Sequence, residues 1–211
     1  STVTFNDDGD DDNLVIDAEF TSTLTVNLDD GDNTLNASAY TGTITAAIAE
    51  AIADAVADTH TITGGTGSGD IILVTADGTG IDNADMTTLT KFEKLTIANN
   101  ASTGTIVLDE LNIDDGKTFT VDSSSITTAS NTFTLNAADD TNGILVVTGS
   151  AGIDTITMSS SDQGDNLSLA GANDIIYVAA NHLTSSDTIN GGDGTDTLSY
   201  TSDEAIILSD F

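Results

Sequence analysis

The chain has 211 residues and carries 35 acidic side chains against three lysines, which gives a formal net charge of −32. It contains no cysteine, so disulfides and thiolate metal sites are excluded. A chain this negative repels phosphate backbones, so no nucleic-acid partner is expected. No apolar run approaches the about 20 residues of a membrane-spanning helix, so no membrane insertion is expected either.

The acidic charge needs a physical explanation. Thirty-five carboxylates on one compact body repel each other, and bound cations relieve that repulsion. The composition therefore favours a calcium-dependent extracellular protein. The alternative is an acidic, solubilising surface suited to a salty habitat.

Short apolar clusters follow one another along most of the chain. Ile71–Val74, Thr105–Leu108 and Ile144–Val147 are typical, and Gly, Asp, Asn or Ser bound each of them. β-Branched residues favour strands, and the bounding residues favour turns. The pattern predicts an all-β solenoid, a parallel β-roll or β-helix. For residues 1–148, a β-sandwich is also compatible with it.

One segment has a different periodicity. Ile44, Ile48, Ile52 and Val56 recur every four residues in an Ala-rich stretch. This spacing predicts one short amphipathic helix near residues 45–60, with its apolar stripe packed against the β-core.

The C-terminal third contains a repeat. The unit is Asp, any residue, a bulky aliphatic residue and any residue, and its aspartates stand at spacings of 11, 9, 13 and 9. The last copy, Gly191–Ser199, matches the pattern GGxGxDxUx at every fixed position. If each unit forms half a coil, an aspartate faces its counterpart about eighteen residues away. Asp154, Asp174 and Asp196 follow one another at slightly longer intervals, which small insertions explain.

These residue types suit calcium. The ion takes about six to eight oxygen ligands, which turn carbonyls and carboxylates supply, and glycines permit the tight turns. The predicted calcium ligands are Gly152, Asp154, Asp165, Asn173, Asp174, Asp187, Gly191, Asp193, Gly194 and Asp196. Ser150 replaces the second glycine of its copy, and the copy before Asp174 lacks the double glycine. In those coils, and at the imperfect copy Gly64–Ile72, the alternative to calcium binding is that the aspartate is only a turn residue.

The complete copy resembles the RTX nonapeptide of calcium-binding β-rolls. Leu35–Gly42 and Phe92–Ile97 also resemble phrases of bacterial RTX-type surface-layer (S-layer) proteins and large RTX adhesins. The specific motif covers about residues 149–200, and looser similarity covers most of the chain. The resemblance implies type I secretion, an extracellular location on the bacterial cell surface and calcium-dependent assembly.

No enzyme is expected. The two histidines, His60 and His182, are far apart in the sequence, and neither a zinc-protease HExxH motif nor a phosphate-binding loop occurs.

The sequence thus predicts two parts: residues 1–148, a Thr/Asp-rich β-region with one helix, and residues 149–211, an RTX-like β-roll continuous with it. The first hypothesis for function is a secreted, calcium-stabilised structural protein that assembles with its own copies into a surface layer, sheath or filament. Cell-surface polysaccharide is a further expected partner.

The second hypothesis is an adhesin segment that binds a glycan, a surface or ice. Threonine pairs at a spacing of 20 favour it: Thr21/Thr23, Thr41/Thr43 and Thr61/Thr63. An accessory domain of an enzyme would require a catalytic region outside these residues.

Overall fold

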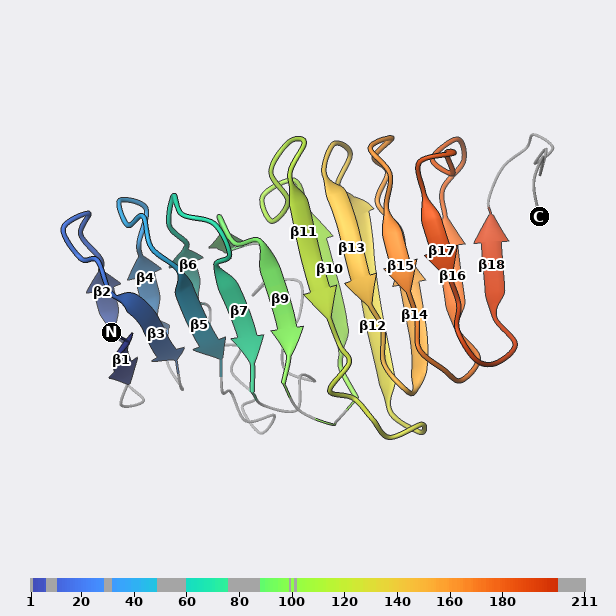
Figure 1. Ribbon diagram of the computed structural model, residues 1–211, viewed down its shortest axis with the longest axis horizontal. Coiled ribbons are helices and arrows are strands. Elements are labelled where there is room, and N and C mark those ends of the chain that lie inside the picture. Colours follow the sequence, from blue (N-terminus) through green and yellow to red (C-terminus); the bar gives the residue numbers. More distant parts are fainter. Residues whose placement is uncertain are drawn as a thin grey trace.

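The chain forms an all-β parallel solenoid of about eight turns. The computed structural model describes residues 2–6, 11–28, 32–48, 60–75, 88–98, 100 and 102–200. Figure 1 shows the coils stacked along the long axis, with the N-terminal coil at one end and the C-terminal coil at the other. The prediction of an all-β solenoid is therefore confirmed.

The strands of the described residues are short, as the apolar clusters predict. In chain order they are β1 (Thr2–Asn6), β2 (Asn13–Val15), β3 (Thr23–Leu28), β4 (Thr34–Asn36), β5 (Ile44–Ile48), β6 (Thr61–Thr63), β7 (Ile71–Val74), β8 (Leu89–Thr90), β9 (Lys94–Ile97), β10 (Thr105–Asp109), β11 (Thr118–Asp122), β12 (Thr132–Asp139), β13 (Ile144–Thr148), β14 (Ile153–Thr157), β15 (Asn166–Ser168), β16 (Ile175–Val178), β17 (Thr188–Asn190) and β18 (Thr197–Tyr200).

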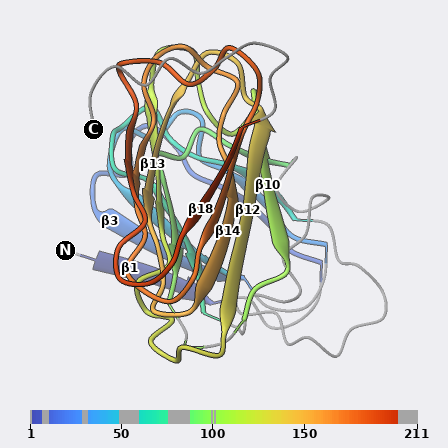
Figure 2. The same cartoon turned by 90° about the vertical axis from the view of Figure 1, so that its right-hand side faces the viewer.

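The chain alternates between two layers. Odd-numbered strands form one nine-stranded parallel sheet, in the order β1-β3-β5-β7-β9-β11-β13-β15-β17. Even-numbered strands form a four-stranded sheet, β2-β4-β6-β8, and a five-stranded sheet, β10-β12-β14-β16-β18. Figure 2 looks along the stack and shows the two layers facing each other. The nine-stranded sheet continues across residue 148, whereas the second layer changes sheet between β8 and β10.

The core lies between the layers. Side chains alternate between the two faces of a strand, and β12 accordingly alternates partly buried and buried residues over most of its length. Register pairing stacks one inward position of the nine-stranded sheet into a continuous apolar column. Its members are Phe5, Val26, Ala46, Ile72, Leu95, Val121, Val147, Leu167 and Ile189. Each coil therefore buries its apolar residues against its two neighbours.

The prediction of a helix near residues 45–60 is wrong for the first residues of that segment. Ile44–Ile48 forms strand β5, which pairs with β3 and β7. A spacing of four is also a multiple of two, so Ile44 and Ile48 point to the same face of a strand, and neighbouring strands decide the outcome. Residues 49–59 lie outside the described residues. No helix occurs among the described residues, and hence none long and apolar enough to cross a membrane.

Two further expectations for the N-terminal part are wrong. The β-sandwich alternative for residues 1–148 fails, because the described strands there pair in parallel as successive coils. The threonine pairs do not form one row, because Thr23 lies in the nine-stranded sheet and Thr61 and Thr63 in the four-stranded sheet. The coils differ in length, so residues at a constant spacing of 20 do not occupy the same position in successive coils. The register instead aligns Thr4, Thr25 and Thr45.

A pair of leucines tests the position of the core. Leu145 is fully buried in β13, whereas Leu111 is 55% exposed. Leu145→Ala is expected to lower the free energy of unfolding by about 2–5 kcal/mol, through lost burial and the cavity left behind. Leu111→Ala is expected to lower it by less than about 0.5 kcal/mol. Urea unfolding of both variants measures the difference, and equal losses would contradict this core.

Candidate functional site

Aspartates form a ladder at the corner where the chain passes from the nine-stranded to the five-stranded sheet. The amide of Asp154 donates to Oδ1 of Asp174 at 2.9 Å, and the amide of Asp174 donates to Oδ1 of Asp196 at 3.1 Å. The three residues hold equivalent positions on successive coils. The prediction that these aspartates face each other from coil to coil is confirmed.

The other corner, where the chain returns to the nine-stranded sheet, holds a second ladder. The amide of Leu145 donates to Oδ1 of Asp165 at 2.9 Å, and the amide of Asp165 donates to Oδ1 of Asp187 at 2.8 Å. The aspartates predicted as calcium ligands are therefore divided between two corners of the coil.

The remaining predicted ligands lie in the stacked turns beside the first ladder. Asn173 accepts a hydrogen bond from the amide of Thr195 through Oδ1 at 2.8 Å. Asp193 forms an isolated parallel β-bridge with Gly171. Gly152 packs against the carbonyl of Asn131.

Two glycines of the complete repeat copy are required by close approach. A Cβ at Gly191 would lie 2.2 Å from Oδ2 of Asp196. Gly194 has a φ of +143°, and a Cβ there would lie 1.6 Å from the carbonyl oxygen of Ala172. The glycines of the motif thus let each turn fold over its own aspartate and rest on the previous turn.

The same arrangement of hydrogen bonds recurs in earlier coils, where the chain enters β7 and β9, with a glutamate as one of the acceptors. Asp70 accepts the amide of Ile44 through Oδ1 at 2.9 Å and the amide of Gly65 through Oδ2 at 2.8 Å. The amide of Asp70 in turn donates to Oε2 of Glu93 at 2.7 Å. Asp70 of the imperfect copy therefore has the same structural role as the C-terminal aspartates.

A third ladder uses neutral acceptors. The amide of Asp12 donates to Oδ1 of Asn33 at 2.8 Å, and the amide of Asn33 donates to Nδ1 of buried His60 at 3.4 Å. Sequence reasoning missed these residues and Glu93, because the predicted repeat is marked only by aspartate. The signal that finds them is a polar residue directly before a strand.

Burial raises the pKa of three ladder carboxylates, those of Asp154, Asp165 and Asp174. Asp154 and Asp174 are fully buried. Burial, with a smaller contribution from Asp174, raises the pKa of Asp154 to about 7. Burial and the charge of Asp196 raise the pKa of Asp174, and burial and the charge of Asp187 raise the pKa of Asp165.

Within the part of the chain that the structure describes, two buried carboxylate oxygens have no hydrogen-bond partner. They are Oδ2 of Asp174 and Oδ2 of Asp140, a residue that sequence reasoning did not select. Burial, with the charges of Glu110 and Asp165, raises the pKa of Asp140 to about 6. A buried carboxylate oxygen without a partner is costly, so each of these positions calls for a proton or a cation.

The oxygen atoms near the first ladder limit which metal could bind there. Among the described residues, no three acidic or histidine side chains lie close enough to hold a metal together. Asp154 commits both oxygens to Ser150, accepting its amide at 2.9 Å and its hydroxyl at 2.6 Å. Oδ2 of Asp174 is the buried oxygen of this ladder that has no hydrogen-bond partner among the described residues. A carboxylate oxygen is the kind of ligand that calcium takes, but this is fewer carboxylates than the repeat predicts.

No protein family model matches the chain, and no curated protein or solved structure matches it either. Its function is therefore inferred from the fold and from the geometry of the ladders.

Asp70 tests the ladder itself. Asp70→Ala leaves the amides of Ile44 and Gly65 buried without their acceptor, so we expect the free energy of unfolding to fall by about 2 kcal/mol or more. Asp70→Asn keeps one acceptor oxygen and is expected to lose less. The exposed control Asp115→Ala is expected to change stability by less than about 0.5 kcal/mol. Urea unfolding decides, and equal effects of the two alanine variants would refute the role.

Acid titration tests the buried carboxylates. The pKa of Asp154 is raised to about 7 in the folded state, against about 3.9 in an unfolded chain. The folded state therefore binds more protons between about pH 4 and pH 7, so stability without calcium falls as the pH rises through that range. Asp154→Asn is expected to flatten this slope in thermal unfolding measured from pH 4 to pH 8 in EDTA. An unchanged slope would show that Asp154 ionises normally.

Proposed function

We propose that the protein is a secreted, calcium-stabilised structural solenoid of RTX type, which assembles with its own copies into a layer, sheath or filament on a bacterial cell surface. The observation that carries the proposal is Oδ2 of Asp174, a buried carboxylate oxygen without a partner in the middle of a ladder of like charges. The net charge of −32 supports it, because a chain this acidic gains from bound cations.

The proposed mechanism is ionic. Oδ2 of Asp174 and carbonyl oxygens of the turns at 169–173 and 191–195 would hold the ion, which supplies the positive charge that the ladder lacks. Where calcium is scarce, the buried carboxylates oppose folding and the chain stays exportable through a type I route. Outside the cell, calcium binds only the folded coils and stabilises them by mass action.

The ends of the described solenoid support self-assembly. Within the described residues, β1 and β17 pair with only one neighbour in their sheet, as do β2 and β18 in theirs. Val3 of β1 is 43% exposed and Leu198 of β18 is 45% exposed. Such open parallel edges favour end-to-end stacking of copies, and calcium would also bridge their acidic faces.

A second candidate is an adhesin segment that binds a glycan, a surface or ice. The aligned Thr4, Thr25 and Thr45 on successive coils favour it, because they place hydroxyls in a regular row. A catalytic role is not proposed. His60 accepts the amide of Asn33 within a ladder, and His182 lies 3.4 Å from Asp162.

The test is a calcium titration followed by far-UV circular dichroism and light scattering together. We expect the β-signal and the particle size to rise together at about 0.1–1 mM calcium, the range of extracellular sites. Asp174→Asn is expected to raise the calcium midpoint by about tenfold, because the site loses a ligand charge. The control Asp115→Asn is expected to leave it unchanged.

The outcomes separate the two candidates. A rising β-signal with a monomeric particle would support calcium stabilisation but not assembly, and would favour the adhesin segment. If neither calcium nor EDTA changes either signal, the aspartates serve only the turns and the proposal is wrong.

A further inference from the structure

The turn at residues 140–143, which joins β12 to β13, contains two buried oxygen atoms without hydrogen-bond donors. They are Oδ2 of Asp140 and Oδ1 of Asn142, and neither has a partner among the described residues. Asp140 is fully buried. Both residues precede the glycine–aspartate repeat of residues 149–200, so the repeat does not account for them. Two such oxygens in one short turn point to a bound group that the protein itself does not supply.

Hydrogen bonds fix this turn from within and from both sides. The carboxylate of Asp140 accepts the amide of Gly143 through Oδ1 at 3.2 Å and also interacts with the amide of Asn142. The carbonyl of Asn142 accepts the amide of Gly116, on the coil before, at 3.0 Å. The carbonyl of Asp140 accepts the amide of Ser160, on the coil after, at 2.7 Å. The two residues are therefore held together in a turn that both neighbouring coils support.

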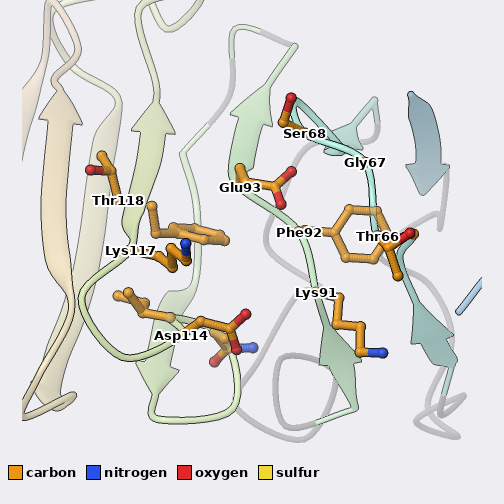
Figure 3. A pocket seen from close by; sticks show the side chains of 13 residues that line it. Thr66, Gly67, Ser68, Lys91, Phe92, Glu93, Asp114, Lys117 and Thr118 are labelled. Carbon is orange, nitrogen blue, oxygen red and sulfur yellow. The ribbon is translucent and has the colours of Figure 1, made fainter. Parts of the chain in front are cut away.

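The turn also packs closely on the loop of the coil before. A Cβ at Gly143 would lie 2.2 Å from Cγ2 of Ile113, so the two segments are in contact. Residues 112–119 of that loop line a cavity of about 470 Å³ (Figure 3). Neither Asp140 nor Asn142 is among the residues that line it. The two buried oxygens therefore belong to the turn and not to the cavity.

Carboxylates of both neighbouring coils lie near Asp140. Glu110, on the coil before, accepts the amide of Thr141 through Oε1 at 2.8 Å. The charges of Glu110 and of Asp165, on the coil after, both act on Asp140. Within the described residues, none of these three carboxylates forms an ion pair. Negative charge is thus concentrated where two oxygens lack a donor, and a cation would offset it.

The ligand types indicate which cation suits the turn. A carboxylate oxygen and an amide oxygen are both ligands that calcium takes, and its flexible coordination allows waters to complete the set. Magnesium demands nearly ideal octahedral geometry and is harder to accommodate in a fixed turn. We propose that the turn at residues 140–143 binds a calcium ion through Oδ2 of Asp140 and Oδ1 of Asn142.

The number of charged ligands sets the expected affinity. No three acidic or histidine side chains of the described ranges are close enough to hold a metal together. Asp140 is then the single carboxylate that binds the ion directly, and Glu110 and Asp165 act on it through space. Calcium affinity falls with the charge of the ligands, so the site is expected to be weak and to fill at about 0.1–1 mM calcium.

The inference goes beyond the proposed function, which rests on Asp174 at the other corner of a later coil. It does not require a cation at Asp174. A calcium ion in this turn would stabilise the junction between the coils that precede the repeat and the coils that contain it, because the turn is bonded to Gly116 and to Ser160.

The test is a calcium titration of the full chain, labelled with ¹⁵N, at about pH 7.5 and 0.15 M salt. The amide NMR signals of Asn142 and Gly143 report on the turn, either by shifting or, if calcium is needed for folding, by appearing. Asp140→Asn is expected to raise their calcium midpoint by about tenfold, because the site loses its charged ligand. Asn142→Asp is expected to lower it by about tenfold, because the site gains one. The matched control Asp139→Asn, at an exposed neighbour, is expected to change it by less than about twofold.

Three results would overturn the inference. If calcium moves neither signal of the folded protein, a proton or a water satisfies the two oxygens. If Asn142→Asp weakens the calcium response, the side chain of Asn142 donates to Asp140 and does not bind an ion. If Asp139→Asn acts as strongly as Asp140→Asn, cations are only attracted to an acidic surface.

The variant Asp174→Asn keeps this site distinct from the proposed function. A tenfold gain from Asn142→Asp in the Asp174→Asn background would support the turn site whether or not Asp174 binds calcium. An effect of Asp174→Asn alone, with none from Asp140→Asn or Asn142→Asp, would leave the proposed function intact and refute the turn site. Circular dichroism at saturating calcium confirms that each variant is folded.

Discussion

The solenoid depends on satisfying the backbone amides at its corners. At several corners, the amide at or directly before the start of a strand is met by a side chain from the next coil rather than by a carbonyl. Oδ1 of Asp174 does this for Asp154, Oδ1 of Asp70 for Ile44, and Nδ1 of His60 for Asn33. A buried amide without an acceptor costs about 1–3 kcal/mol, a large fraction of the stability of a domain. Polar residues therefore recur where strands begin, and the apolar column fills the space between the layers.

Using carboxylates for this purpose concentrates negative charge inside the coil. Ser150 relieves the problem at Asp154 by donating both its amide and its hydroxyl to that carboxylate. The next coil has no such serine, and Oδ2 of Asp174 is left without a partner. Of these two copies, the one that lacks the double glycine is thus the one whose buried aspartate keeps an oxygen without a donor. The glycine pattern of a copy therefore does not by itself decide how its carboxylate is satisfied.

The sequence was sufficient for features that depend on repetition. The apolar clusters predict the strands, and the spacing of Asp154, Asp174 and Asp196 predicts their alignment. It was insufficient at Ile44–Ile48, because a four-residue spacing suits both a helix and a strand and pairing with β3 and β7 decides between them. The ladder members Asn33, His60 and Glu93 were missed because their role is set by position, not by residue type.

The solenoid also separates its ladders along the stack. Asp174 lies between β15 and β16, whereas Asp70 lies at the other corner of an earlier coil, directly before β7. In a repeat architecture each coil contacts only its neighbours, so a change in charge at one corner is not transmitted by packing to coils several turns away. Screening at physiological salt limits the electrostatic reach in the same way. A cation held beside Asp174, as proposed, would therefore stabilise the C-terminal coils directly, whereas the ladder of Asp70 would have to be stable through its own hydrogen bonds.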